Sequence, residues 1–282
     1  MSTSDERGPP PGSTFEADWL SLREAADHRS RSAELLAPLL REWRTRGWRS
    51  IVDLGSGTGS NVRYLAPRLP QPQDWVLVDH DRLLLERASI PMEAGTPTRV
   101  VGDLAEEGLE AVGDADLCVA AALLDLVSGA WLGRVIERCV RGGRGALFST
   151  TYDGTFAWDR DASHADDHLV LDLLNRHQTR DKGLGAALGP RAAFVARTLF
   201  ERVGYRTWLV PSPWRLGPPE RALAERLLDG WVAAATEQSP READRIERWA
   251  SAKRGRLDAG TYTLTVGHLD LLALPRESDA PA

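Results

Sequence analysis

A glycine-rich segment follows an apolar run early in the chain, and its composition suits the binding of a small polar ligand. The apolar run covers 51–54, and glycines stand at every second position from 55 to 59. Because glycine has no Cβ, the backbone can turn sharply there and approach a ligand closely. A helix beginning at residue 60 or 61 would also leave free N–H groups facing the ligand. The residues expected at this ligand are Gly55, Ser56, Gly57, Gly59 and Asn61.

Acidic side chains accompany this segment at the ends of apolar runs. Asp53 stands two residues before the first glycine, where a carboxylate can hold an ammonium group or order the amides of the loop. Asp79 ends the next apolar run and is followed by His80. An acid at the end of the second strand takes the two ribose hydroxyls in nucleoside-binding α/β folds. Asp103 ends a third run. These positions predict a site for a ligand that contains a nucleoside.

The spacing of the glycines separates two classes of nucleoside ligand. It is G-x-G-x-G, whereas the NAD fingerprint is G-x-G-x-x-G, and no glycine stands at 61 or 62. Segment 53–61, together with the acids at the ends of the next two strands, resembles motif I and the following strands of class I S-adenosylmethionine (SAM) dependent methyltransferases. The resemblance implies SAM as cofactor, with Asp53 and the glycine loop under the methionine end and Asp79 on the ribose. It further implies that Asp103 accepts from the adenine amino group and that Leu104 packs nearby.

A helix before the glycine-rich segment is the next element that the resemblance concerns. In this family such a helix often covers the SAM pocket, and an arginine on it can hold the methionine carboxylate. Arg23 and Arg31 are the two candidates here. The alternative for each is a position on a solvated helix face.

The residues that would contact a methyl acceptor are less sharply marked. Asp125 follows the fourth strand and is either a base, a substrate ligand or a structural loop acid. The segment contains neither the Asn/Asp-Pro-Pro-aromatic motif of nucleobase amine methyltransferases nor the Pro-Cys nucleophile of cytosine-C5 methyltransferases. Its sequence therefore disfavours these two classes of enzyme that act on nucleic acid.

An insertion at 152–190 is rich in functional groups and leaves from the carboxyl end of a central strand. We predict that it overhangs the pocket, with Tyr152, His164 or His168 contacting substrate. The two histidines are one helical turn apart, a spacing that can bind a metal, but Ser163 to Asp166 also reads as a helix capping box. We predict no metal site. His177 and Lys182 flank a glycine-containing loop that is either a lid over the substrate or a plain connection between helices.

The order of the predicted elements gives the fold class. Apolar runs at 51–54, 75–79, 98–101, 116–122 and 144–151 alternate with helical patterns, which is typical of a parallel sheet covered by helices. Two more strands are predicted at 205–211 and 261–274. With the family resemblance, this gives a doubly wound, Rossmann-like α/β fold with seven strands, helices on both faces and the last strand antiparallel.

The sequence also predicts how the rest of the chain is organised. One methyltransferase domain is expected at 15–275, beginning with a helical stretch at 15–46. Its insertions are 152–190 and 218–260, the second being a helical hairpin with helices at 221–237 and 241–254. The polar ends 1–14 and 276–282 are expected to be disordered tails.

Composition restricts the class of partner and the compartment. The formal net charge is −6, and no long run of Lys or Arg offsets it, so nucleic acid and anionic membranes are poor partners. The two cysteines, Cys118 and Cys139, are far apart and read as buried free thiols, which argues against a disulfide scaffold or a zinc site. No apolar stretch has the length of a membrane span, and the start of the chain has no apolar core of a signal peptide. The expected compartment is the cytoplasm.

The favoured interpretation is a SAM-dependent methyltransferase that acts on a small molecule. The sequence does not distinguish O-, N- and C-methylation, and it does not indicate the oligomeric state. Two alternatives stay open: a protein or RNA methyltransferase that uses the 218–260 hairpin for docking, and a SAM-binding regulatory protein without turnover. An NAD-dependent dehydrogenase is disfavoured by the glycine spacing.

Overall fold

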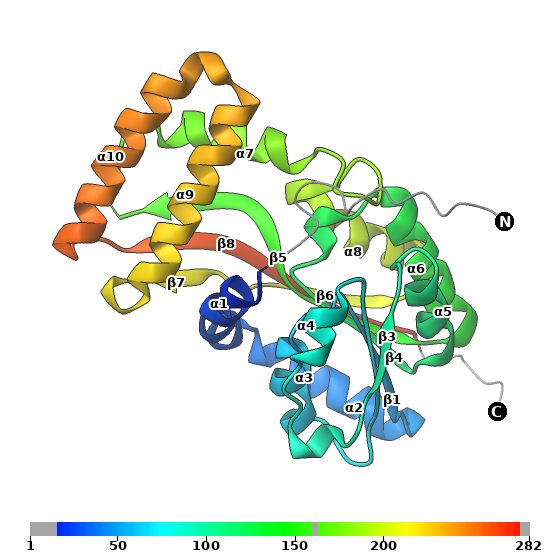
Figure 1. Ribbon diagram of the computed structural model, residues 1–282. Helices are drawn as coiled ribbons and strands as arrows, with labels where there is room; N and C mark the ends of the chain where they lie inside the picture. The colour runs from blue at the N-terminus through cyan, green and yellow to red at the C-terminus, as the bar shows by residue number, and fades with distance from the viewer. Residues whose placement is uncertain (1–15, 160–162, 277–282) are drawn as a thin grey trace, which may run out of the picture.

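A mixed β-sheet forms the centre of the molecule. The computed structural model describes residues 16–159 and 163–276. The sheet has the strand order β3-β2-β1-β4-β5-β8-β6, and β7 pairs with β8 outside this path (Figure 1). The predicted seven-stranded fold is confirmed along the path, with the short β7 as an addition. The predicted tails lie, apart from residue 276, outside the described residues.

The strands fall into a parallel and an antiparallel group. The parallel strands are β1 (Ser50–Leu54), β2 (Asp74–Asp79), β3 (Thr98–Val101), β4 (Leu117–Ala121) and β5 (Gly145–Trp158). The antiparallel pairings join β8 (Leu264–Leu274) to β5, to β6 (Arg206–Pro211) and to β7 (Trp214–Leu216). The expected antiparallel last strand is therefore confirmed. The carboxyl ends of the parallel strands meet at one edge of the sheet, where ligands bind in open α/β folds.

Helices cover both faces of this sheet and bury its apolar side chains in two cores. On one face lie α5 (Glu107–Asp114), α6 (Gly129–Gly142) and α8 (Ala192–Arg202). On the other lie α2 (Leu36–Arg46), α3 (Ser60–Leu65) and α4 (Arg82–Glu86). Burial of the sheet on both faces explains why its central strands read as continuous apolar runs rather than as alternating patterns.

The helical stretch predicted at 15–46 is interrupted in the structure. The helix α1 (Ala17–Ser30) ends at Arg31, whose ψ of 135° is extended, and α2 begins only at Leu36. The backbone N–H of Ser32 donates to the Asp270 carboxylate on β8 at 2.9 Å, which anchors the break to the sheet. As a result α1 and α2 do not form one continuous helix, and α1 packs against β7. A local apolar pattern does not reveal this interruption, because the bond that fixes it joins residues far apart in sequence.

The fifth strand is longer than predicted. The sequence predicts that it ends at 151, shortly before Asp153-Gly154, a pair common in turns. Instead β5 continues to Trp158 beside β8, and the pairing is irregular between Tyr152 and Phe156. Gly154 has a φ of +88°, so the turn pair forms an irregularity within the strand rather than its end. The predicted insertion therefore begins as sheet.

The two predicted insertions pack together into one helical layer, here called the roof. It consists of α7 (Asp167–Gln178), α9 (Arg221–Gln238) and α10 (Ala243–Ala259), over the extended parts of β5 and β8 (Figure 1). A separate apolar core fills it, with Phe156 stacked on Trp231 at 4.5 Å between ring centres. The predicted hairpin is confirmed as α9 and α10. Its assignment as part of one domain that covers the substrate stays a prediction.

Two further findings concern the cysteines and the lengths of the helices. Cys118 on β4 and Cys139 on α6 are buried and unbonded, as predicted. Within residues 16–159 and 163–276, every helix is too short or too polar to pass through a bilayer.

Candidate functional site

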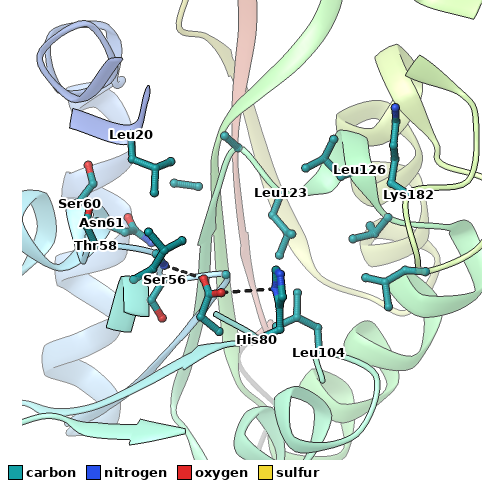
Figure 2. A pocket seen from close by; sticks show the side chains of 18 of the residues that line it. Leu20, Ser56, Thr58, Ser60, Asn61, His80, Leu104, Leu123, Leu126 and Lys182 are labelled. Carbon is teal, nitrogen blue, oxygen red and sulfur yellow. Dashed lines mark hydrogen bonds and ion pairs between the residues drawn. The ribbon is translucent and has the colours of Figure 1, made fainter. Parts of the chain in front are cut away.

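A cavity of about 350 Å³ opens at the carboxyl edge of the parallel strands. Its wall comes from the glycine-rich turn after β1, the ends of β2, β3 and β4, the helix α1 and a loop at 182–184 (Figure 2). The volume is that of a small-molecule site. Nine residues predicted at the site line this cavity: Gly55, Ser56, Gly57, Asn61, Asp79, His80, Asp103, Leu104 and Lys182.

The glycine-rich turn has the backbone conformation that its sequence predicts. Gly55, Gly57 and Gly59 have φ values of +65°, +51° and +83°, a region that residues with a Cβ rarely adopt. A Cβ on Gly57 would also lie 3.0 Å from the Leu20 side chain of α1. Gly59 does not itself line the cavity; it precedes α3, which begins at Ser60, one of the two predicted starting positions. The turn therefore brings bare backbone to the cavity wall.

Asp79 is held in place by backbone amides at the end of β2. Its Oδ2 accepts from the Gly57 N–H at 2.8 Å, and its Oδ1 accepts from the Asp81 N–H at 2.9 Å. The residue is 6% exposed, and it lines the cavity together with His80, whose Nδ1 lies 3.4 Å from its Oδ1. Each carboxylate oxygen has two acceptor sites, so both can still accept from a ligand hydroxyl. Asp81 has a different role, because it caps α4 by accepting from the N–H groups of Leu83 and Leu84.

The end of β3 supplies an acid and an apolar side chain to the same wall. Asp103 is exposed, and its Oδ1 accepts from the Ala105 N–H at 2.6 Å. Its own N–H donates to Glu107 at 2.8 Å, which fixes the backbone there. Leu104 lines the cavity together with Leu123, which follows β4 (Figure 2). The wall thus offers a carboxylate beside an apolar surface, as a flat heteroaromatic group requires.

A buried relay of three polar residues lies behind the glycine-rich turn. Arg31 Nη1 donates to Asn61 Oδ1 at 2.7 Å, and Asn61 Nδ2 donates to Asp53 Oδ1 at 2.8 Å. Only Asn61 lines the cavity; Arg31 is covered by the Tyr64 ring, 4.5 Å from its guanidinium carbon. The structure thus places Arg31 and Asp53 behind the wall, joined to it through Asn61.

Both ends of this relay keep an unused polar atom. Asp53 Oδ2 and Arg31 Nε are buried and form no hydrogen bond within the described residues. Burial raises the pKa of Asp53 to about 7, against the opposing effects of the Asn61 hydrogen bond and the Arg31 charge. Burial also lowers the pKa of Arg31. Such an unpaired carboxylate oxygen is costly in isolation and fits a site completed by a cationic ligand group.

The helix α1 contributes a paired arginine to the cavity wall. Arg23 binds Asp27 through two bonds of 2.9 and 3.2 Å, and the Trp214 indole N–H donates to Asp27 at 3.1 Å. Arg23, Asp27 and Leu20 all line the cavity. Sequence reasoning considered Arg23 but missed Leu20 and Asp27. The i,i+4 spacing of Arg23 and Asp27 was an available signal for their pairing, though not for their position.

Asp125 and Tyr152 lie beside the cavity rather than on its wall. Asp125 is buried in the short turn 124–126, and its Oδ1 has no hydrogen-bond partner within the described residues. Burial raises the pKa of Asp125 to about 6; hydrogen bonds from the backbone of Asp125 and Tyr152 and the charges of Arg23 and Lys182 oppose this effect. The Tyr152 hydroxyl donates to Asn175 on α7 at 3.2 Å, and burial raises its pKa. Ala122, just before this turn, has a φ of +53°, a strain typical of functional sites.

Three predicted histidines do not line the cavity. His164 accepts from the Asp166 N–H through Nδ1 at 3.0 Å at the start of α7, and His168 is exposed on that helix. His177 Nε2 lies 3.2 Å from Glu237 on α9, and burial lowers its pKa. Across the described ranges there is no group of three or more His, Cys, Asp or Glu side chains that could hold a metal ion.

Comparison with known proteins gives a result for structure alone. No protein-family model matches the sequence, and no curated protein matches it. A cyclopropane-fatty-acyl-phospholipid synthase-like protein from Lactobacillus casei has a similar structure, with a TM-score of 0.50 and 12% identity, over 92% of this chain and 94% of that one. A SAM-dependent methyltransferase from Geobacter sulfurreducens, in complex with S-adenosyl-L-homocysteine (SAH), has a TM-score of 0.41 and 18% identity, over 93% and 99%. One from Thiobacillus denitrificans, also with SAH, gives the same values.

The strand order and the glycine-rich turn agree with the structural similarity to the Lactobacillus casei protein. The parallel strands, the antiparallel β8 between β5 and β6, and the glycine-rich turn after β1 occur together in this chain. The Lactobacillus casei structure matches nearly the whole of both chains. The chain therefore has a Rossmann-like α/β fold, a mostly parallel sheet with helices on both faces, similar to that of the Lactobacillus casei protein.

Proposed function

We propose that this protein is a methyltransferase that binds SAM and transfers its methyl group to a small-molecule acceptor. The observation that carries the proposal is Asp79, a carboxylate that lines the cavity and is oriented by the Gly57 and Asp81 amides. A carboxylate in this position suits the two ribose hydroxyls of an adenosyl ligand. Asp53 lies behind the wall and acts on the methionine part through Asn61, whose side chain donates to it and lines the cavity.

In this proposal, different residues of the cavity bind different parts of SAM. The turn Gly55–Gly57 supports the methionine end with bare backbone, while Asp103 and Leu104 bind the adenine. SAM supplies a methyl carbon activated by the neighbouring sulfonium, so the protein mainly has to align that carbon with the acceptor and exclude water. Leu123, Leu126 and Val127, which follow β4, form the apolar wall suited to that exclusion. The cytoplasm stays the expected compartment.

The alternative of a macromolecular acceptor has less support from the hairpin of α9 and α10. The large apolar side chains of these helices, among them Leu228, Trp231, Ile246 and Trp249, are buried within the roof. The charged residues of these helices pair with one another, as Arg254 does with Asp229 and Glu247. A small-molecule acceptor therefore remains the favoured proposal.

A labelling experiment separates the alternatives. The purified protein is incubated with methyl-labelled SAM and with the low-molecular-mass, protein or RNA fraction of cells. We expect label only in the low-molecular-mass fraction, and none with the Asp79→Ala variant. Label in protein or RNA would support the macromolecular alternative. Binding of SAH without labelling of any fraction would support a regulatory role without turnover.

Asp125 gives a prediction for the pH dependence of transfer. We propose that this buried carboxylate accepts a proton from the acceptor, because one oxygen is unpaired and its pKa is raised to about 6. The rate of transfer should then rise with pH as Asp125 loses its proton near pH 6 and level off above pH 7. The Asp125→Asn variant should lose this rise, whereas Asp172→Asn, an exposed acid of α7, should keep it. An unchanged pH profile in Asp125→Asn would contradict the role.

A further inference from the structure

Among the described residues, the cavity wall contains one basic side chain, that of Lys182, without an acidic partner. Three residues with a basic side chain line the cavity: Arg23, His80 and Lys182. Arg23 is paired with Asp27, and His80 Nδ1 lies 3.4 Å from Asp79. Lys182 has no ion pair within 4.0 Å in the part of the chain that the structure describes. Its ammonium group is thus available to a ligand.

Lys182 is half-buried, and this burial makes its charge costly. Leu126, Val127 and Leu184 line the same part of the cavity. Burial lowers the pKa of Lys182, although the charges of Glu237 and Asp125 oppose this effect. Glu237 itself is bound by both His177 and Arg180. A negative group of a ligand would meet little competition from the protein.

The loop that carries Lys182 is fixed to the rest of the site. Asp181 Oδ1 accepts from the N–H groups of Gly183 and Gly185 at 2.7 and 3.1 Å. The Leu188 N–H donates to the Val127 carbonyl at 2.8 Å, beside the first turn of α6. These bonds hold the backbone of the loop against the segment that follows β4. Lys182 is therefore positioned by the fold rather than carried on a free chain.

Lys182 lies away from the part of the cavity assigned to the cofactor. Figure 2 shows it on the opposite side from Ser60 and Asn61, with Leu123 and Leu126 in between. Its ammonium group points away from His80 and the end of β2. A cation at this place suits the second reactant better than the ribose or the methionine.

We propose that Lys182 binds a negatively charged group of the methyl acceptor, which is therefore a small molecule with an apolar body and an acidic group. This inference rests on the proposed methyl-transfer function. The apolar body packs against Leu126, Val127 and Leu184, and the acidic group pairs with the ammonium of Lys182. The acceptor's nucleophile then lies between this anchor and the methyl group of SAM.

The lysine content of the chain allows a direct test. The sequence contains two lysines, Lys182 and Lys253, and Lys253 is 1% exposed and bound to Asp167 at 2.7 Å. Protein labelled with ¹³C at lysine Cε therefore gives one signal from the cavity and one internal reference. The SAH-saturated protein is titrated with 4-phenylbutyrate and, separately, with the uncharged 4-phenylbutanamide. A Lys182→Gln variant assigns the signals.

The expected result is a saturable shift of the Lys182 signal with the acid, and an increase in the pKa of Lys182. The amide should bind about 10- to 150-fold more weakly, since a hydrogen bond to a charged group contributes about 1.5–3 kcal/mol. Lys182→Gln should weaken binding of the acid by roughly the same factor and leave the amide unchanged. Arg180→Gln is the matched control, because that guanidinium is already paired with Glu237. It should bind the acid as the wild type does.

Three outcomes would overturn the proposal. They are equal binding of acid and amide, no response of Lys182 to the acid, and a loss of SAH affinity in Lys182→Gln that would assign the side chain to the cofactor. SAH binding is measured first by calorimetry. If SAH does not bind, the proposed methyl-transfer function fails, while the response of Lys182 to the acid is still read in the cofactor-free protein.

Discussion

Replacing Asp79 by alanine should reduce the affinity for SAM and SAH by a factor of about 10² to 10⁴. The proposed ribose contacts are two hydrogen bonds to a carboxylate, each contributing about 1.5–3 kcal/mol. The variant also leaves the Gly57 N–H without its acceptor, which loosens the turn that supports the methionine end. Calorimetric titration with SAH gives the affinity, and circular dichroism shows whether the variant is folded.

A neighbouring acid supplies the control for this prediction. Asp81 is two residues away and accepts bonds only at the start of α4. Asp81→Ala should lower the free energy of unfolding by about 1 kcal/mol through loss of the helix cap, while affinity stays within a factor of about two. SAH lacking its ribose hydroxyls should bind wild type and Asp79→Ala equally weakly. If Asp79→Ala still prefers the complete ligand to the same degree as wild type, the ribose assignment is wrong.

Asp53→Asn should make the protein more stable at pH 8 and a poorer binder of SAM. The carboxyl has its ordinary pKa of 3.8 when unfolded and a pKa of about 7 when folded. Because the folded value is the higher one, the folded state binds the proton more tightly. The contribution of Asp53 to stability is therefore most favourable below pH 4 and is lost as the pH rises to 7. Asparagine cannot ionise, so it avoids this loss.

The expected gain in stability and the expected loss of SAH affinity both arise from the Asp53 carboxylate, and their sizes can be given. A shift of about three pKa units corresponds to about 4 kcal/mol, the upper limit of the stability gain expected at pH 8. The gain should disappear near pH 4. Asn61 should lose the charged acceptor that holds its side chain at the cavity wall, which should weaken SAH binding by about 10- to 100-fold. Wild type should bind less tightly below pH 7, as Asp53 becomes protonated, and this dependence should be absent in the variant.

Asp116, which lies at the other end of β1 from Asp53, provides the control for this prediction. Asp116 accepts from the N–H groups of Arg49 and Ser50 at 2.8 and 2.9 Å, far from the cavity wall. Asp116→Asn should therefore destabilise the protein and leave SAH affinity unchanged. Unfolding curves in urea at pH 4 and pH 8, with calorimetric titrations, measure all these quantities. A loss of stability in Asp53→Asn at pH 8 would show that the carboxylate is structural.

The sequence predicts the backbone of the glycine-rich turn and the position of Asp79 because these signals are local. Glycine permits positive φ angles, and Gly55, Gly57 and Gly59 adopt them. An acid that ends a buried parallel strand must lie at the carboxyl edge of the sheet, and Asp79 lies there. Short spacing along one strand and one turn determines these positions, so a linear pattern is sufficient to find them.

The other half of the site depends on contacts between distant segments. Arg31 lies behind the cavity wall because α1 ends there, which is fixed by the bond from Ser32 to Asp270 on β8. Asp27 is oriented by Trp214, which lies 187 positions further along the chain. His168 belongs to α7 and His164 precedes it, and this helix packs on α9 rather than on the cavity. No local pattern contains this information, because it depends on which apolar faces of the roof meet.

Calorimetric titration of the purified protein with SAM, SAH and NAD, side by side, tests the central claim most directly. The structure brings the glycine-rich turn, Asp79 and Asp103 together around one cavity, and we propose that this cavity binds the adenosyl cofactor. We therefore expect micromolar binding of SAM and SAH at one site per chain, and no heat from NAD. Binding of NAD without SAH, or no binding of either adenosyl ligand, would contradict the account.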